Sequence, residues 1–345
     1  MRGGAVVTSY DVARLAGVSQ PTVSRTFRDS PLISPATKER VRAAASSLGY
    51  TPNQQGRVLA TRTTNRIGVV ATELANPFYM ALLDPLHDAL RRHGFTIALI
   101  PDSAESPLEL GNLVDGSLDG IVLTTCRLGS SLPAELTLRG VPAVTVNREV
   151  RSAAVDSCAI ANARGAAELA RLLTSCGHRE IAAIFGPSDT STGRSREQGF
   201  RRGLATAGVR MDPGRTWRGE FTFATGYNSA AAALGASARP TALFCANDVI
   251  ALGALDAARA AGADVPGDLS VVGFDDIPMA GWRVFDLTTM HCDLGRLART
   301  AADLLVARMR DPQAPRRRVV IDPSLVLRSS HRDRLGTWAT HTPDR

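Results

Sequence analysis

The sequence predicts an α/β fold, with a small N-terminal helical domain followed by a larger core of two doubly wound subdomains. Its 345 residues, 44% of them hydrophobic, are enough for two or three packed domains. Residues 8–49 have the caps and the apolar spacing of three short helices. After residue 66, short apolar runs alternate with helical patterns, which is typical of a parallel sheet covered on both faces.

The first predicted helix begins after Thr8. Thr8 is a favourable N-cap, and Asp11 follows it at the spacing of a capping box. Gly17 should end the helix, because glycine readily adopts the left-handed conformation of a C-cap. The buried face is expected to consist of Val12, Leu15 and Ala16.

Two more helices complete the predicted N-terminal domain. Ser19 caps the second helix, where Pro21 is tolerated because the first turn leaves its N–H groups unbonded anyway. Ser34 and Pro35 open the third helix in the favoured order of cap and proline, and Gly49 ends it. The inward side chains are predicted to be Val23 and Phe27 on the second helix and Val41, Ala44, Ala45 and Leu48 on the third.

Positive charge is concentrated in this N-terminal part of the chain. Residues 1–66 contain ten basic and three acidic side chains, a net charge of +7. The whole chain contains 40 and 33, so the remaining residues are balanced at 30 and 30. A small basic domain on a neutral body is typical of a protein that binds a polyanion with one end.

The first two helices have the order of a helix-turn-helix, whose second helix enters the major groove of DNA. We therefore expect Arg25 to read guanine, Gln20 to pair with adenine and Pro21 to contact a thymine methyl. The expected phosphate contacts are Tyr10, Ser19, Thr22, Ser24, Arg28, Ser34 and Asn53. The alternative is a helical hairpin that merely carries solvated charges.

The core is predicted from its alternating pattern. Strands are expected at 67–71, 95–100, 121–125, 141–146, 181–185, 242–245 and 269–273, and helices at 78–93, 108–116, 163–175, 196–207, 227–234 and 249–261. Pro85 lies inside the first of these helices and should kink it near Ala81. The first subdomain would comprise about 67–157 and a returning segment near 292–320, and the second about 158–290 and the C-terminal segment.

Ligands of doubly wound sheets bind where loops leave the carboxyl ends of the strands. The candidate ligand-binding residues at such places are Phe78, Arg196, Phe221, Asn247, Asp248 and Asp275. Carboxylates and amides can pair with vicinal hydroxyls, an arginine can fork onto oxygen, and aromatic rings offer an apolar face. This set suits a sugar-like ligand. The alternative is that Asp248 only caps a helix and Asp275 only forms a turn.

Two segments of the N-terminal domain, TSYDVARLAGVSQPTVSR and SPATKERVRAAASSLGYTPN, resemble the DNA-binding headpiece of the LacI/GalR family, the lactose- and galactose-repressor type of transcription regulator. The resemblance extends over nearly the whole chain. IGVVATELANPFY, RSREQGF, FCANDVIALGAL and VPGDLSVVGFDD resemble the family's effector-binding core, which is shared with periplasmic sugar-binding proteins. The resemblance implies effector contacts at Phe78, Arg196, Phe221, Asn247 and Asp275, with Asp248 adjacent.

The same resemblance implies a homodimeric repressor of operator DNA that a small ligand controls allosterically. The headpiece would comprise residues 1–52, a hinge helix and linker 53–66, and the core 67–345. In the hinge, Leu59 would wedge into the minor groove. Gly56 replaces the usual alanine, which costs a helix about 1 kcal/mol. Ala161 and Leu172 stand where aspartate and histidine are frequent, and this leaves the identity of the effector open.

Other function classes fit the sequence poorly. It has no GxSxG or HExxH motif, and neither its six histidines nor its five cysteines have metal-ligand spacing. We therefore expect no enzyme, no cofactor and no metal. No apolar run approaches the roughly 20 residues of a membrane span, and no signal peptide is evident, so a cytoplasmic protein with buried, reduced cysteines is expected.

Three alternatives stay open at this point. The effector could be a nucleoside or purine instead of a sugar, and the ligand could act as a corepressor instead of an inducer. From a different class, the core alone would also fit a solute-binding receptor of a transporter, although residues 8–60 and the missing signal peptide argue against it.

Overall fold

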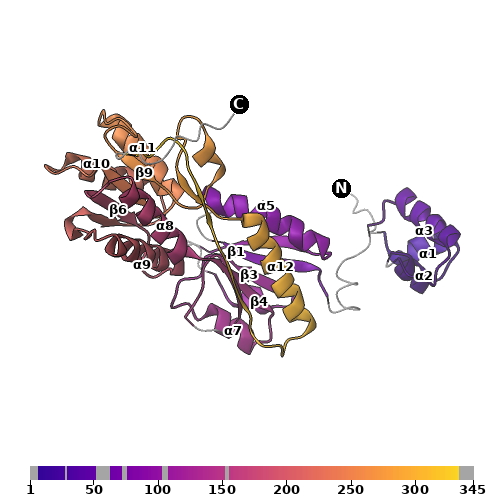
Figure 1. Ribbon diagram of the computed structural model, residues 1–345. Helices are drawn as coiled ribbons and strands as arrows, with labels where there is room; N and C mark the ends of the chain where they lie inside the picture. Colours follow the sequence, from indigo (N-terminus) through magenta and orange to yellow (C-terminus); the bar gives the residue numbers. More distant parts are fainter. Residues whose placement is uncertain are drawn as a thin grey trace. The chain divides into compact units, whose positions relative to one another are not determined.

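The computed structural model describes residues 7–27, 29–51, 63–71, 76–102, 108–151 and 155–333 (Figure 1). The chain divides into two compact units, Met1–Thr64 and Asn65–Arg345. Within the described residues, no helix is both long enough and apolar enough to span a bilayer.

The N-terminal unit contains three helices, α1 (Ser9–Ala16), α2 (Gln20–Phe27) and α3 (Pro35–Ser47). The predicted caps are confirmed: the Asp11 carboxylate accepts from the Thr8 backbone N–H at 3.0 Å, and Gly17 ends α1 with φ 62°. The small core consists of Val12, Ala13, Ala16, Val23, Val41, Ala44 and Ala45.

Leu15 was wrongly predicted to be buried, and 56% of its surface is exposed. Ala13 is buried instead. At 100° per residue, the buried arc of α1 runs from Val12 through Ala16 to Ala13, and Leu15 lies outside this arc.

The first subdomain of the core is built on a parallel sheet in the order β11-β5-β4-β3-β1-β2. Its strands are β1 (Arg66–Ala71), β2 (Thr96–Pro101), β3 (Gly120–Leu123), β4 (Ala143–Val146), β5 (Asp156–Ile160) and β11 (Arg318–Ile321). Its helices are α5 (Pro77–Arg92), α6 (Gly111–Val114), α7 (Leu132–Leu138) and α12 (Leu294–Arg310). Val122 packs into the cluster that contains α5 and α12 side chains, whereas Ile121 and Leu123 pack with α6 and α7 on the other face.

The second subdomain contains the parallel sheet β7-β6-β8-β9. Its strands are β6 (Ile181–Phe185), β7 (Thr216–Arg218), β8 (Ala242–Cys245) and β9 (Ser270–Val272). Its helices are α8 (Asn162–Ser175), α9 (Ser191–Thr206), α10 (Phe223–Gly235) and α11 (Asp248–Ala260), with short 3-10 helices at Pro213–Arg215 and Pro278–Gly281. Helices α8 and α9 form one pair and α10 and α11 another (Figure 1).

The chain crosses between the subdomains after β5, between β10 (Thr289–His291) and α12, and between β11 and β12 (Ser324–Val326). Strands β10 and β12 pair antiparallel. Strand β5 pairs with β4 and β11, so it belongs to the first sheet. The expected boundary at 157/158 falls inside this strand, and we place the first crossing after Ile160.

Several predicted elements have different bounds. Helix α9 begins five residues before Arg196, because Thr190 caps it by accepting from the Gly193 N–H at 3.1 Å. Helix α10 begins at Phe223, and the helix expected at 108–116 is only α6. Helix α5 continues through Pro85 to Arg92. The sequence did not predict β5, α7, β7, β10, α12, β11 or β12.

The close packing of α8 on α9 depends on a glycine. A Cβ atom at Gly199 would lie 2.1 Å from the backbone oxygen of Ala163. We expect Gly199→Ala to lower the free energy of unfolding of the core by about 1–3 kcal/mol, because backbone would have to move. Chemical unfolding followed by tryptophan fluorescence measures this, since all three tryptophans lie after residue 65.

The matched control is Gly235→Ala at the end of α10, where no atom lies within 4 Å of the new Cβ. This variant should be neutral or stabilised by up to about 1 kcal/mol. Equal stability of the Gly199→Ala variant and the wild type would show that the two helices are not held at this distance.

All five cysteines are buried, as predicted. Burial raises the pKa of the Cys126 and Cys158 thiols to about 12. These thiols are therefore protonated near neutral pH and are poor nucleophiles.

Candidate functional site

Helix α2 presents the predicted base-reading residues of the N-terminal unit. Arg25 and Pro21 are exposed, and no ion pair of Arg25 is found among the described residues. Gln20 is half-buried, and its Nε2 donates to the Ser9 hydroxyl at 3.3 Å. The Arg25 guanidinium is thus available for an external acceptor, while Gln20 would have to give up a weak contact.

The residues predicted to contact phosphate differ in their exposure and in their hydrogen bonds. Tyr10 is 70% exposed. The Ser19 and Thr22 hydroxyls share a hydrogen bond of 2.9 Å, and Ser34 caps α3 by accepting from the Thr37 N–H at 3.3 Å. Ser24 is half-buried. Arg28, Asn53, Leu59 and Gly56 lie outside the described residues.

Three other cations of this unit pair with its acids. Lys38 and Arg42 pair with Asp29 at 2.8 and 3.4 Å, and the hydrogen bond from Lys38 lowers the pKa of the Asp29 carboxyl. Arg14 pairs with Asp11. These pairs join the turn after α2 to α3 and brace the first turn of α1. Arg25, in contrast, is exposed on α2 and forms no ion pair with the described residues.

In the core, five of the six predicted ligand-binding residues line a single pocket. Its full lining is Asn76, Phe78, Tyr79, Asn147, Arg148, Thr192, Arg196, Phe221, Asn247 and Asp275. Most of these residues follow the carboxyl end of a strand, β1, β4, β7, β8 or β9, while Thr192 and Arg196 lie on α9. The carboxyl ends of the two sheets therefore face one another across this cleft.

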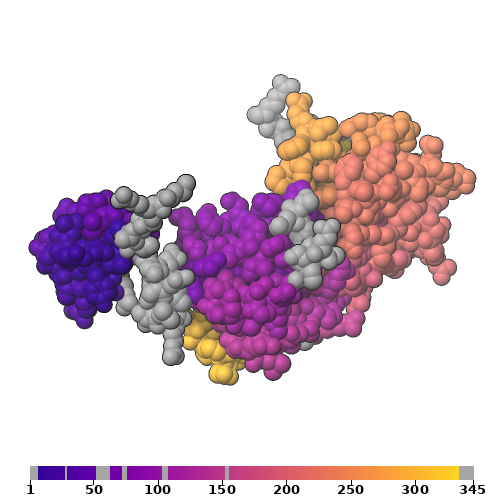
Figure 2. All heavy atoms as spheres, turned by 180° about the vertical axis from the view of Figure 1, so that it is seen from behind, coloured from indigo at the N-terminus to yellow at the C-terminus, as the bar shows by residue number. Residues whose placement is uncertain are grey.

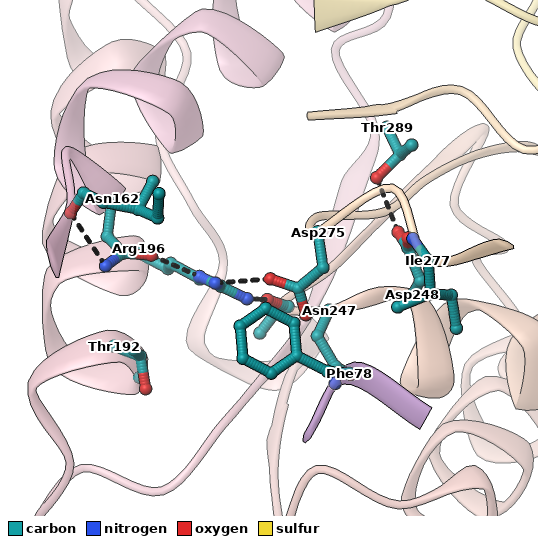
Figure 3. Close-up of polar contacts among 12 residues, drawn as sticks. Phe78, Asn162, Thr192, Arg196, Asn247, Asp248, Asp275, Ile277 and Thr289 are labelled. Carbon is teal, nitrogen blue, oxygen red and sulfur yellow. Dashed lines mark hydrogen bonds and ion pairs between the residues drawn. The ribbon is translucent and has the colours of Figure 1, made fainter. Parts of the chain in front are cut away.

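Arg196 is the central polar group of the pocket and is only 2% exposed. Its Nε donates to Asn162 Oδ1, its Nη1 to the Ala246 carbonyl and its Nη2 to Asp275 Oδ1, each at 2.7 Å (Figure 3). Its Cζ lies 3.9 Å from the centre of the Phe274 ring. These contacts leave two of its five N–H groups for a ligand. Burial raises the pKa of Asp275, and the Arg196 guanidinium opposes this shift.

Sequence reasoning missed the pair that follows β4. Asn147 is 4% exposed, and its Oδ1 has no hydrogen-bond partner among the described residues. The Arg148 guanidinium lies 5.8 Å from the Tyr79 ring centre and 5.6 Å from that of Phe221. The signal was present, because both residues directly follow the strand expected at 141–146.

Asp248 does not line the pocket, and its role differs from the predicted one. Asn247, not Asp248, caps α11, by accepting from the Ile250 N–H at 3.0 Å. The buried Asp248 carboxylate accepts from the Ile277 N–H at 2.9 Å and from the Thr289 hydroxyl at 2.5 Å (Figure 3). It therefore connects the start of α11 to the loop that carries Asp275 and to β10, one of the crossing strands.

The pocket is narrow in this structure. Its cavity volume is about 20 Å³, which is room for a single water molecule. Hydrogen bonds cross the cleft from Asn76 Nδ2 to the Phe221 carbonyl at 3.4 Å and from the Glu149 N–H to the Ser191 hydroxyl at 2.8 Å. A ligand larger than a water molecule therefore needs a wider pocket than the one in this structure.

Comparisons with known proteins agree with both parts of this description. Residues 8–53 match the model described as bacterial regulatory proteins, lacI family, and residues 170–331 match a periplasmic binding protein-like domain. The transcriptional regulator CelR of Thermobifida fusca is 35% identical over 92% of this chain and 96% of its own. The chain belongs to the LacI family. The repressor PurR of Photobacterium profundum is 30% identical over 95% of this chain and 99% of its own.

Solved structures of LacI-family members match along almost the whole chain. A complex of CelR with cellobiose is 33% identical with a TM-score of 0.73, covering 94% of this chain and 99% of that one. A lac repressor dimer bound to operator and the anti-inducer ONPF is 28% identical with a TM-score of 0.81, covering 94% and 98%. This LacI-family protein is thus a ligand-controlled DNA-binding transcriptional regulator.

The stability of this LacI-family core should depend on pH through Asp248. Burial, and next the nearby Asp275 charge, raise the pKa of Asp248 from 3.8 to about 7. The folded state therefore binds this proton more tightly than the unfolded chain does, and the resulting stabilisation is lost as the pH rises towards 7. Between pH 5 and 8, this group should lower the free energy of unfolding by about 2–3 kcal/mol.

The variant Asp248→Asn should lack this dependence, because its amide can serve the Ile277 N–H and the Thr289 hydroxyl without titrating. Urea unfolding of both proteins at pH 5 and pH 8, followed by tryptophan fluorescence, gives the difference directly. A wild type and a variant with the same pH dependence would rule out Asp248 as its source.

Proposed function

We propose that this regulator is a homodimeric repressor that recognises operator DNA through α2 and releases it when a sugar binds in the core pocket. The lining of that pocket is the observation that supports a sugar as the ligand. Asp275, Asn247 and Arg196 offer hydrogen bonds to hydroxyl groups, while Phe78 and Phe221 offer apolar faces. A polyhydroxylated ring has both kinds of surface. Cellobiose is the first sugar to test, because a relative is known in complex with it.

The cleft supplies the coupling between sugar and DNA. A sugar that fits between the two subdomains would change their relative position. The linker from the headpiece joins the first subdomain at Asn65, whose N–H donates to Asp119 Oδ2 at 2.8 Å. A movement of this subdomain therefore reaches the linker directly. In a dimer, the same movement in both chains changes the separation of the two headpieces, and with it their fit to two half-sites.

Exposed apolar side chains support a homodimer. Met80 on α5 is 53% exposed and Leu99 on the edge strand β2 is 41% exposed. On the second subdomain, Trp282 is 55% and Val284 is 56% exposed. A two-fold dimer that covers such residues would present two headpieces to a pseudo-palindromic operator.

The protein acts without catalysis in this proposal. Adjacent carboxylates that could imitate a catalytic pair diverge: Asp275 bonds Arg196, whereas Asp276 accepts from Arg328 Nη2 at 2.7 Å. The core pocket and the proposed partners, DNA and a sugar, thus suit a soluble, cytoplasmic binding protein better than a hydrolase.

The test has two arms. A thermal-shift panel of sugars and nucleosides identifies the effector, since a ligand at 100 times its Kd stabilises the core by about 2.7 kcal/mol. Fluorescence anisotropy with duplexes from upstream of its own gene then measures DNA affinity with and without the effector. A solute-binding receptor would bind the sugar and ignore every duplex. If a purine stabilises the core and sugars do not, the effector is a purine instead of a sugar. If the ligand tightens DNA binding, it acts as a corepressor instead of an inducer.

A further inference from the structure

We propose that the core carries a second DNA-contacting surface, formed by arginines around the loop between α12 and β11. This arginine surface consists of Arg139, Arg310, Arg316 and Arg317, and it would bind the phosphate backbone of the duplex that the headpieces hold. The inference rests on the proposed function as a DNA-binding regulator. The new element is a contact between DNA and the core, the part of the chain in which positive and negative charges are equal in number.

The arginine surface is a local excess of positive charge. Residues 308–318 contain five arginines and one acid, Asp311. Arg310, Arg316 and Arg317 are exposed, and none forms an ion pair with the described residues. The neighbouring Arg318, in contrast, is held by Glu149 at 2.6 and 3.0 Å. The charges of the loop are thus available to an external anion.

Arg139 adds to this charge from the other side of a hollow. The C-terminal end of α7 and the loop together line a cavity of about 210 Å³, to which Gly140 and Arg316 both contribute. Arg139 precedes Gly140 and is exposed. In Figure 2 the loop belongs to the yellow surface that emerges at one end of the purple subdomain.

A buried ion pair holds the loop in one conformation. Arg308 is 4% exposed, and its guanidinium donates to the Asp156 carboxylate at 2.8 and 3.2 Å. The same guanidinium donates to the carbonyls of Pro312, Ala314 and Pro315 at 3.0, 2.6 and 3.1 Å. Asp156 also accepts from the Arg317 N–H at 2.7 Å. The exposed arginines are therefore presented on a preorganised backbone, which lowers the entropic cost of binding.

The position of the loop favours DNA over an acidic protein. All strands of this sheet are parallel, so Arg317, before β11, and Asn65, before β1, lie at the same edge. Four strand spacings separate β11 from β1 in the sheet, which is about 19 Å. The linker from the headpiece enters at this edge, and its residues 52–64 can span at most about 45 Å. The effector pocket lies at the opposite, carboxyl edge, because most of its lining residues follow the carboxyl ends of strands.

The test uses the full-length double variant Arg316→Gln/Arg317→Gln. Its control is Arg202→Gln/Arg210→Gln, which removes the same charge from two exposed arginines of the second subdomain. Anisotropy with a random-sequence 40-bp duplex gives the slope of log Kd against log salt between 50 and 300 mM KCl. Each lost phosphate contact should reduce this slope by about 0.9, so a dimer that loses two to four contacts changes by about 2–4.

We expect the reduced slope only in the loop variant, together with unchanged effector affinity and unchanged circular dichroism. Equal slopes for the loop variant, the control and the wild type would overturn the inference while leaving the proposed function intact. Binding of polyglutamate that the loop variant alone loses, with an unchanged DNA slope, would likewise overturn it in favour of an acidic protein. A wild type that binds no duplex at 50 mM KCl would instead refute the proposed function itself.

Discussion

Replacing Arg25 by alanine should remove the preference of this regulator for its operator while leaving its general affinity for DNA nearly intact. Arg25 is exposed on α2 and has no acidic partner among the described residues. A bidentate arginine–guanine contact discriminates between bases by about 1–3 kcal/mol, and a dimer has two such contacts. We therefore expect the ratio of specific to random-duplex affinity to fall by about 30-fold or more.

The matched control is Arg40→Ala, which removes the same charge from an exposed position on α3. It should weaken binding to both duplexes by a similar small factor, because the general attraction of a positive charge to the phosphate backbone carries no sequence information. If the variant Arg25→Ala keeps the wild-type ratio, α2 does not read bases through this residue.

Replacing Arg196 by methionine should have the largest effect on the core. The change leaves Asp275, Asn162 and the Ala246 carbonyl without their partner in a buried site. Breaking a buried ion pair on one side typically costs about 3–5 kcal/mol. We expect a loss of this order in the free energy of unfolding, and the loss of the sugar response.

Two comparisons separate this effect from a general loss of charge. Arg318→Met breaks the exposed pair with Glu149 and should cost less than about 1 kcal/mol. The double variant Arg196→Met/Asp275→Asn removes both charges and should recover part of the stability of the single variant. Urea unfolding followed by tryptophan fluorescence ranks all three, and a single variant as stable as Arg318→Met would contradict the role of Arg196.

The sequence predicted the elements whose signals are local. The caps at Thr8, Ser19 and Ser34 act on neighbouring residues, so the three headpiece helices could be placed almost to the residue. The start of α9 could not, because its first turns are polar and show no apolar period before Gly199 and Phe200. Strands β5 and β11 depend on pairing between segments about 160 residues apart, and no local sequence pattern indicates this pairing.

The candidate site was predictable where its residues follow the carboxyl ends of parallel strands, because ligands of such sheets bind there. Phe78, Phe221, Asn247 and Asp275 follow strand ends, and the structure brings them together. Other features of the site are tertiary contacts between distant segments. These are the hydrogen bonds of Asp248 to Ile277 and Thr289 and the stacking of Arg196 on Phe274. Chain order carries no information about such contacts.

The central claim is that one ligand in the cleft sets the affinity for DNA, and thermodynamic linkage tests it most directly. The Kd of the effector is measured with and without saturating operator duplex, and the Kd of the duplex with and without saturating effector. The account predicts that both ratios are the same, in the range of about 5–150-fold. An effector that binds the core with equal affinity in the presence and absence of operator would contradict it.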